Sequence, residues 1–458
     1  MPPTRDHEVV ADAPSRRGLL GVILIVGLAL RVVYVLTARL NVETGFQYDM
    51  MFYRNVAGNL AAGRGYRFFW KPTAMWPPGY PVFLAAVHLV APGGWLAAQL
   101  AQAVLGTITC AGTFVLGRAI FGERAGLWAA ALLAICPEAI AFTPLLLSET
   151  LFATLWTWWL VLLVTASRSA ASATAARWLA LGLLAGLATL VRGVGLLAPV
   201  IAVSAWLASG VGLRVTFGRT AWMGGALVLA LLPWTIRNAK VLGAPIAVST
   251  ELGEVMSVAH SPIATGGLTS WEPESPVDFL RRQAVASATR VRRDDLPPDQ
   301  REAAVSRDET WRAIQWVLDN PGRELSLILP RVAFLYRNGR AAYLWGRVVE
   351  GDKTLPLYDP TWDERLMTAS DWHFYALLVL GLAGMLTPRL RAAPWHLVLF
   401  FTIAWVTVLH GVVLFGDPRF HFPLLPVLAT LSGGFLAWLA GRRSRAAGGG
   451  LSSDPARP

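Results

Sequence analysis

The stretch Pro233-Trp234-Thr235-Ile236-Arg237-Asn238 decides the architecture of this chain, because a long apolar segment ends there. A polar stretch follows and continues to Asp371, where apolar sequence resumes. It predicts a small soluble domain on one side of a chain that otherwise lies in a membrane. A second polar loop, near the N-terminus, carries Asp49. A simple pore or anchor needs neither loop, so the pattern indicates an enzyme that works at a membrane surface.

The composition excludes an ordinary soluble domain. Hydrophobic residues make up 55% of the chain and charged residues only 15%, whereas soluble domains have roughly 25% charged residues. The net charge is +11, but the Arg residues are scattered among short loops and form no stripe for nucleic acid. Membrane orientation and lipid phosphate explain this charge better. Cys110 and Cys136 both fall in apolar segments, so we interpret them as core residues and not as a disulfide or metal pair.

We predict ten membrane spans, since roughly 20 apolar residues cross about 30 Å of hydrocarbon. They are residues 19–37, 95–116, 125–142, 145–164, 178–191, 194–209, 221–236, 372–386, 395–415 and 422–440. No cleavage site follows the first run, so it is interpreted as an uncleaved span. Residues 79–90 are too few to cross alone and are expected at the interface or re-entrant. The predicted fold is a polytopic α-helical membrane protein with two extracytoplasmic loops, the larger a small mixed helical domain.

The domain boundaries follow from these spans. We predict a cytoplasmic tail (1–18), a transmembrane module (19–239) with the first outer loop at 38–78, an outer domain (240–371), C-terminal spans (372–441) and a second cytoplasmic tail (442–458).

Loop charge predicts the orientation. The predicted inner turns carry Arg16, Arg17, Arg118, Arg124, Arg168, Arg177, Arg214, Arg219, Arg389, Arg391, Arg442, Arg443 and Arg445. The only acid in the short inner connections is Glu123. Because positive residues favour the cytoplasmic side, we predict both termini inside and both long loops outside the cytoplasmic membrane.

Hydrophobic periodicity predicts helices in both outer loops. After Asp49, apolar side chains recur at Phe52, Val56 and Leu60, and Gly63 and Gly65 end the helix. In the outer domain we predict turns around 262–276, a charged helix at 277–293, and a helix with Trp311, Ile314 and Leu318 that ends at Asn320-Pro321-Gly322. A last helix carries Leu325, Ile328, Val332 and Leu335 with Arg331 and Arg337 among them. This pattern is typical of an interfacial helix with basic residues at headgroup level.

Six ordered motifs carry a family resemblance. They are Tyr48-Asp49 with Tyr53, Ala57, Leu60 and Gly63-Arg64-Gly65-Tyr66; Trp76-Pro77-Pro78-Gly79-Tyr80-Pro81; Leu147-Ser148-Glu149; Val191-Arg192-Gly193; the stretch at 233–238; and Pro418-Arg419-Phe420-His421-Phe422-Pro423. As an ordered set they resemble the GT-C glycosyltransferases, more narrowly the bacterial branch related to protein O-mannosyltransferases and lipid A aminoarabinose transferases. The resemblance implies transfer of a sugar from a polyprenyl-phosphate donor, outside the cytoplasmic membrane, with an outer-loop carboxylate as base.

Two carboxylates are the candidate catalytic groups. Asp49 precedes an amphipathic helix at the outer surface, where a positioned carboxylate can take the proton of an attacking acceptor. The alternative interpretation of Asp49 is a helix N-cap. Glu149 matches a second acid of the family, near the outer end of its span. Its alternatives are capping of its own helix or snorkelling to the interface.

Cations near the outer surface are the candidates for binding the lipid phosphate. They are Arg192, Arg237, Arg419, Lys240 and Arg337, and headgroup snorkelling is the alternative for each. Arg31 is the clearest charge within a span and lies near enough to its outer end to snorkel. The motif aromatics Tyr48, Tyr53, Trp76 and Tyr80 are expected to line the substrate cavity.

The sequence gives no support for a metal or another cofactor. Some relatives have a second acid directly after the first-loop Asp, or His before the Pro-Pro pair, but here Met50 and Trp76 occupy these positions. A divalent metal is therefore not carried over. His260, His373 and His421 lack ligand spacing and are interpreted as structural.

The absence of a nucleotide fingerprint fits a lipid-linked donor. The acceptor is a lipid, a polysaccharide or a protein, and membrane lipids are the other expected partners. A non-catalytic lipid or glycan flippase and a structural partner in an envelope glycan machine stay open as alternatives. A transporter would show paired broken spans and midplane charges, and no internal repeat is visible.

Overall fold

The computed structural model describes residues 16–38, 48–168, 174–267, 291–346, 348–350, 353–355, 359–387 and 395–448. Its apolar helices are α1 (Arg16–Thr37), α3 (Gly79–Val90), α4 (Leu96–Phe121), α5 (Glu123–Ala134), α6 (Pro137–Ala141), α7 (Glu149–Arg168), α8 (Ala175–Val191), α9 (Leu197–Ala208, after the 3₁₀ turn η2, Gly193–Leu196), α10 (Leu213–Leu242), α16 (Pro360–Leu386), α18 (His396–Val408, continued by the π turn η4, Leu409–Val413) and α19 (Leu425–Gly448, after the 3₁₀ turn η5, Pro418–Leu424).

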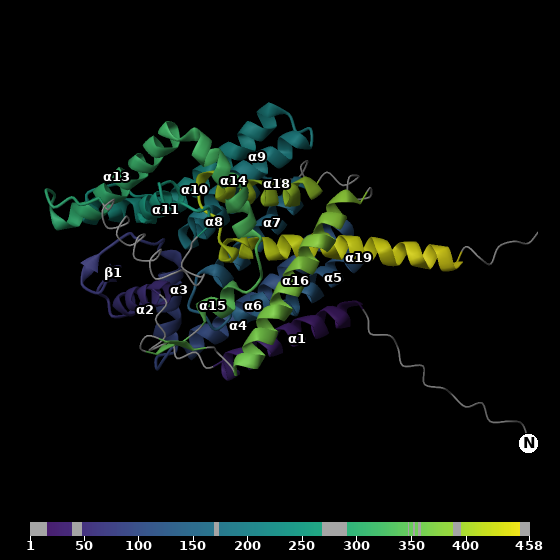
Figure 1. The fold of residues 1–458 in the computed structure, drawn as a ribbon. Helices are drawn as coiled ribbons and strands as arrows, with labels where there is room; N and C mark the ends of the chain where they lie inside the picture. The colour runs from purple at the N-terminus through teal and green to yellow at the C-terminus, as the bar shows by residue number, and fades with distance from the viewer. Residues whose placement is uncertain are drawn as a thin grey trace, which may run out of the picture.

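The remaining elements belong to the polar segments. They are α2 (Tyr48–Ala61), the two-stranded antiparallel hairpin β1 (Arg67–Phe68) and β2 (Lys71–Pro72), α11 (Glu251–Ala259), α13 (Pro298–Asp319), α14 (Pro321–Leu335), α15 (Ala341–Trp345), and a second antiparallel pair, β3 (Val348–Glu350) and β4 (Lys353–Leu355). Figure 1 shows α11, α13 and the β1 hairpin at one end of the molecule, while α19 runs toward the opposite end. These three polar elements therefore lie at one end of the bundle of apolar helices.

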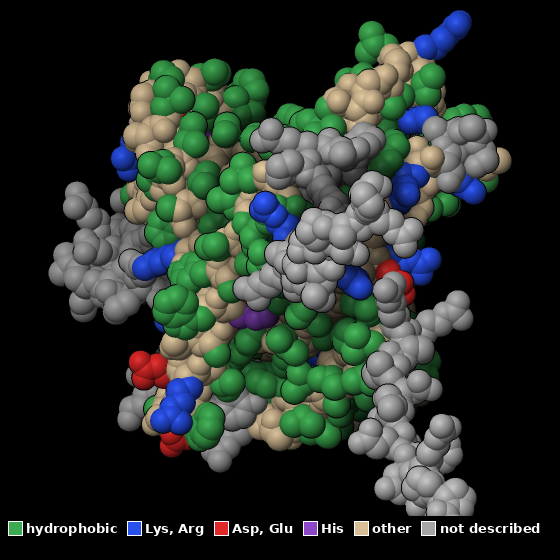
Figure 2. Space-filling view, turned by 90° about the vertical axis from the view of Figure 1, so that its right-hand side faces the viewer, with side chains coloured by type: hydrophobic (Ala, Val, Ile, Leu, Met, Phe, Trp, Pro, Cys, Tyr) green, Lys and Arg blue, Asp and Glu red, His purple; other side chains and the backbone are tan. Residues whose placement is uncertain are grey.

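The predicted class of fold, a polytopic α-helical membrane protein, is confirmed. In the described part of the chain, seven helices are long and apolar enough to cross a membrane: α1, α4, α7, α10, α16, α18 with η4, and η5 with α19. Hydrophobic side chains cover most of the described surface in Figure 2, and acidic side chains are few there. The helices α3 and α8 and the η2–α9 segment are apolar but shorter, so the number of ten spans stays a prediction.

The segment predicted as one span at 125–142 is divided into two helices in the structure. The helix α5 ends at Ala134, Cys136 is extended, and Pro137 begins the separate helix α6. Proline lacks a backbone N–H and disfavours the helical conformation of the residue before it. This break explains Arg31, which was expected to snorkel but is only 1% exposed. Its guanidinium donates to the carbonyls of Leu133 and Ala134 at the end of α5, where a helix leaves carbonyls without their usual i+4 partners.

The span predicted at 145–164 begins later, at Glu149, because residues 145–148 are irregular. Two amides of α4 satisfy the backbone carbonyls of this irregular segment. Gln99 donates to Pro144, and Gln102 donates to Thr143 and Leu145. Non-helical backbone is tolerated at membrane depth only where the protein supplies such partners. These contacts fix the start of α7 and therefore the position of Glu149.

One boundary of the outer domain also differs from the sequence prediction. The last outer residues and the span predicted at 372–386 form one continuous helix, α16, which begins at Pro360 with Asp359 as its side-chain cap. The charged helix predicted at 277–293 lies outside the described residues except for its last three, which are not helical. The two predicted helices that follow are present as α13 and α14.

The prediction that Arg331 lies at headgroup level is wrong. Arg331 is 1% exposed and forms an ion pair with Glu324. Leu325, the next residue after Glu324, is 70% exposed. A buried guanidinium needs a charged partner, and Glu324 supplies it seven residues earlier on α14. The helix therefore presents a mixed face to the protein and not a simple apolar stripe to lipid.

Candidate active site

Arg419 brings together the two carboxylates that the sequence singled out. Its Nη1 lies 2.6 Å from Asp49 Oδ2, and its Nε donates to Glu149 Oε1. Arg192 approaches the same oxygen of Glu149, with Nη1 2.6 Å away. The four charges come from α2, α7, the end of α8 and η5, which lie far apart in the sequence. We refer to Asp49, Glu149, Arg192 and Arg419 as the charge cluster.

Local structure positions each member of the charge cluster. Glu149 begins α7, where the helix dipole favours a negative charge. Arg192 is the extended residue that ends α8, and it also donates to Ser148. Asp417 caps η5 by accepting the backbone N–H of Arg419 at 2.8 Å. The guanidinium of Arg419 lies 4.4 Å from the centroid of the Trp345 ring, a cation–π contact that fixes its plane.

Burial separates the supporting members of the cluster from the accessible ones. The Glu149 side chain is 1% exposed and that of Arg419 is 7% exposed. The side chains of Asp49 and Arg192 are 15% and 18% exposed. A buried carboxylate needs compensating charge, and the two guanidinium groups supply it to Glu149. Asp49 and Arg192 are consequently the members with a surface that a substrate can reach.

A third carboxyl, Glu251, belongs to this site and was missed by the sequence prediction. It begins α11, and its backbone N–H donates to Met75 O at 3.1 Å. The Trp76 indole contributes a hydrogen bond to its carboxylate. Burial and the nearby charge of Asp49 raise the pKa of Glu251 to about 7. The sequence offered no signal for this role, because an acid in the first turn of a helix is a common dipole partner.

The predicted cavity aromatics form a buried wall behind the carboxyl groups. Tyr53, Trp76 and Tyr80 are at most 6% exposed, and the rings of Tyr53 and Tyr80 meet edge to face with centroids 4.9 Å apart. The hydroxyl of Tyr80 donates to Gln102. Burial, and then the charge of Asp49, raise the pKa of Tyr53, so its phenol stays neutral and can donate a hydrogen bond. The side chain of Tyr48 lies outside the described residues.

Three of the five predicted phosphate-binding cations contact neither Asp49 nor Glu149 within the described chain. Arg237 donates to the carbonyls of Tyr66 and Thr73 and lies 5.0 Å from the centroid of the Trp234 ring. It therefore ties the first outer loop to α10. Lys240 is exposed on α10, and Arg337 is exposed beside the Phe334 ring.

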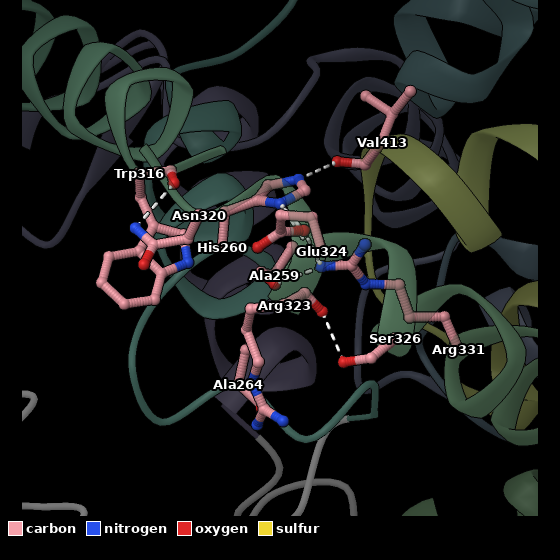
Figure 3. A network of polar contacts seen from close by, with 10 residues as sticks. All are labelled: Ala259, His260, Ala264, Trp316, Asn320, Arg323, Glu324, Ser326, Arg331 and Val413. Atoms are coloured by element: carbon pink, nitrogen blue, oxygen red, sulfur yellow. Dashed lines mark hydrogen bonds and ion pairs between the residues drawn. The ribbon is translucent and has the colours of Figure 1, made fainter. Parts of the chain in front are cut away.

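Two histidines hold the segment that carries Arg419. His260 contacts Glu324 Oε2 through Nδ1 and Val413 O through Nε2, each at 2.8 Å, and Arg331 pairs with the same carboxylate (Figure 3). This network joins the outer domain to η4, just before Asp417. His421 contacts Leu335 O and Glu138 Oε2. Both histidines thus join the segment around Arg419 to the outer domain and to α6.

The residues of this site do not fit a divalent metal. Among the described residues, no three or more His, Cys, Asp or Glu side chains are grouped to hold an ion. Asp49 and Glu149 instead face the guanidinium groups of Arg419 and Arg192. These cations occupy the positions from which a metal would neutralise the carboxylates. We therefore assign no chemical step to a metal ion.

The fold and the site define a class, the polytopic membrane proteins with the GT-C glycosyltransferase fold. The chain matches the archaeal oligosaccharyltransferase AglB from Archaeoglobus fulgidus, solved with an inhibitory peptide and a dolichol-phosphate, with a TM-score of 0.54 and 16% identity over 97% of this chain. It also matches the same enzyme solved with Zn and sulfate, with a TM-score of 0.53 and 16% identity over 93% of this chain and 49% of that one. This chain spans about half of AglB, 52% in the first comparison.

A family model matches one part of the sequence. Residues 76–236 match the family described as dolichyl-phosphate-mannose-protein mannosyltransferase. ArnT from Cupriavidus metallidurans in the apo state matches with a TM-score of 0.49 and 14% identity over 94% of this chain and 62% of that one. No curated protein sequence matches the chain significantly. The resemblance to GT-C glycosyltransferases is thus confirmed by the fold and by the matched segment.

Proposed function

We propose that this protein transfers a sugar from a polyprenyl-phosphate-linked donor to an acceptor at the outer face of the cytoplasmic membrane. The observation that carries the proposal is the charge cluster, in which Arg419 bridges Asp49 and Glu149 and Arg192 pairs with Glu149. The fold shared with AglB and the matched family segment support the same class of reaction.

Asp49 is the proposed general base. As the acceptor oxygen forms its bond to the anomeric carbon, the acceptor proton passes to the Asp49 carboxylate. The bond between that carbon and the phosphate oxygen breaks, and the lipid phosphate leaves with the electron pair. Attack opposite the leaving group inverts the anomeric carbon. The ion pair with Arg419 fixes the direction in which the carboxylate points.

Arg192 is the proposed principal ligand of the donor phosphate. It retains exposed surface and can present two parallel N–H groups to phosphate oxygens. Arg419 is nearly buried between the carboxylates, so its proposed role is to position them. Lys240 and Arg337, both exposed, are proposed to attract the donor headgroup, and Arg237 to hold the first outer loop.

The test is the variant Asp49→Asn in reconstituted protein supplied with a polyprenyl-phosphate sugar. Asn keeps the shape of the side chain but accepts no proton, and loss of a general base costs about 10²–10⁴-fold in rate. We expect that loss in turnover with donor binding retained, and partial activity in Asp49→Glu. The control Asp319→Asn changes an exposed carboxylate on α13 and should be fully active. Near-normal turnover of Asp49→Asn would reduce Asp49 to a helix cap.

A further inference from the structure

A groove of about 650 Å³ opens on the first outer loop, at the far end of α2 from Asp49. It is lined by Asn59, Gly63, Arg64, Arg67, Phe69 and Trp70. The tip of the β1–β2 hairpin supplies the two aromatic rings, while Arg64 lies in the connection from α2 to the hairpin and Arg67 begins β1. None of these side chains belongs to the charge cluster.

The groove is held in shape by contacts between the hairpin and two amides of α2. Phe69 has a φ of 51°, a left-handed conformation that is strained for an aromatic residue. Two amides of α2 stabilise it: Asn55 Oδ1 accepts the N–H of Phe69 at 2.6 Å, and Asn59 donates to the carbonyls of Arg67 and Phe69. These hydrogen bonds hold the tip of the hairpin, whose two aromatic rings line the groove.

The surface of the groove combines aromatic and basic groups. Trp70 is 75% exposed and Phe69 is 49% exposed, an unusual display for two adjacent large rings. Arg64, Arg67 and Lys71 are also exposed, and the sequence from 50 to 122 contains no Asp or Glu. Aromatic faces stack on the apolar faces of sugar rings, and guanidinium groups bind carboxylate or phosphate in two-pronged fashion. An anionic carbohydrate is the ligand that both features fit.

The position of the groove suits a long ligand. Asp49 and Asn59 lie on the same helix, ten residues apart, which corresponds to about 15 Å at 1.5 Å per residue. In Figure 1 the hairpin lies beyond the ends of the long apolar helices, beside the end that carries α13. The hairpin and α13 therefore share one end of the molecule. The strands are only two residues long, so they offer little edge to an extended peptide.

We propose that this groove is a distal subsite for an anionic glycan chain, whose other end reaches Asp49 as the acceptor. The role of this glycan as the acceptor rests on the proposed transferase function, whereas its binding to the groove does not. Trp70 and Phe69 stack on sugar rings, and Arg64 and Arg67 bind their carboxylate or phosphate groups. Of the three acceptor classes, the proposal selects a polysaccharide over a lipid or a protein.

Calorimetric titration of the full chain in lipid nanodiscs tests the proposal, with an oligogalacturonate as the probe. Neutral malto-oligosaccharide of the same length and a poly-glutamate peptide of the same charge are the comparison ligands. We expect the oligogalacturonate to bind, and Trp70→Ala and the double variant Arg64→Ala/Arg67→Ala each to weaken binding by about 10-fold or more. Added salt should also weaken it. The matched controls Trp311→Ala and Arg307→Ala change exposed residues on α13 and should bind as the wild type.

Other outcomes separate this proposal from the transferase proposal. Failure of the wild type to bind oligogalacturonate overturns the subsite. Equal binding of poly-glutamate that survives Trp70→Ala overturns it too, because the groove would then recognise charge on an acidic protein. Asp49→Asn should bind the oligomer as tightly as the wild type. Binding by a wild type that transfers no sugar supports the subsite and defeats only the transferase proposal.

Discussion

Replacement of Glu251 by Gln tests whether the third carboxyl sets the pH dependence of the reaction. Glu251 lies beside Asp49, and its pKa is raised from 4.5 to about 7 by burial and by the Asp49 charge. When Glu251 is ionised, its negative charge makes Asp49 a better proton acceptor. When it is protonated, that help is lost. Activity should therefore rise with pH as Glu251 ionises.

The size of the effect follows from the pKa. With a pKa of about 7, Glu251 is ionised to about 1% at pH 5 and to about 90% at pH 8. If turnover requires the ionised form, kcat/KM falls about tenfold for each pH unit below about 6. The total change between pH 5 and pH 8 is about 90-fold. Gln cannot titrate, so Glu251→Gln should remove this acid limb and leave a lower, flatter profile.

The assay is initial-rate transfer from a short polyprenyl-phosphate sugar in detergent between pH 5 and pH 8. Asp49→Asn supplies an internal comparison: its residual activity should lack this acid limb, because Glu251 acts through the Asp49 carboxylate. An acid limb near pH 7 that persists unchanged in Glu251→Gln refutes the reasoning, since another group would then be responsible.

Stability gives an independent check on the same pKa. The folded pKa is above the unfolded value of 4.5, so the folded state holds its proton more tightly. The contribution of Glu251 protonation to the free energy of unfolding is fully present below pH 4.5 and is lost as pH rises through about 7. Its size is at most about 3 kcal/mol, from 1.36 kcal/mol per pKa unit. Thermal unfolding of Glu251→Gln should lack this decline between pH 4.5 and 7.

Two further predictions concern the cations and the topology. Arg192→Ala should raise the donor KM about tenfold or more, and Arg192→Lys should recover only part of this loss because Lys cannot form two parallel hydrogen bonds to phosphate. Arg237→Ala should instead lower thermal stability and leave the donor KM unchanged. Equal effects of the two Ala variants on KM would contradict the different roles assigned to Arg192 and Arg237. In whole cells, an impermeant thiol reagent should label Asp299→Cys, which is predicted outside, but not Thr174→Cys, which is predicted inside. Both positions are exposed on the protein and the native cysteines are buried, so only the side of the membrane decides the result. Labelling of Thr174→Cys would contradict the predicted orientation.

The sequence predicted the membrane class well because hydropathy is a local property. Each long apolar helix corresponds to a continuous run of apolar residues in the sequence. The helix after Asp49 ended as expected, with Gly63 and Gly65 at positive φ. The break before Pro137 was visible in the sequence, but the long apolar run around it favoured one continuous span. The burial of Arg31 depends on that break, because its acceptors are the carbonyls of Leu133 and Ala134.

The site shows the opposite limit. Asp49 and Arg419 are 370 residues apart, and no spacing rule connects them, so only the ordered family motifs placed them in one prediction. Glu251 lay outside those motifs and was missed. Arg237 lay inside one, but its partners are the carbonyls of Tyr66 and Thr73. A motif identifies a residue that the fold needs without saying whether its contacts serve the substrate or the loop.

In the mechanism proposed above, the charge cluster couples donor binding to proton acceptance. Its two carboxylates and two guanidinium groups balance in formal charge, so a donor phosphate brings an excess negative charge into a largely buried site. The phosphate also competes with Glu149 for Arg192, which reduces the compensation of that buried carboxylate. Both effects make Asp49 and Glu251 hold a proton more firmly. A bound donor therefore strengthens the base that its own reaction requires, while Arg419 keeps that base in place.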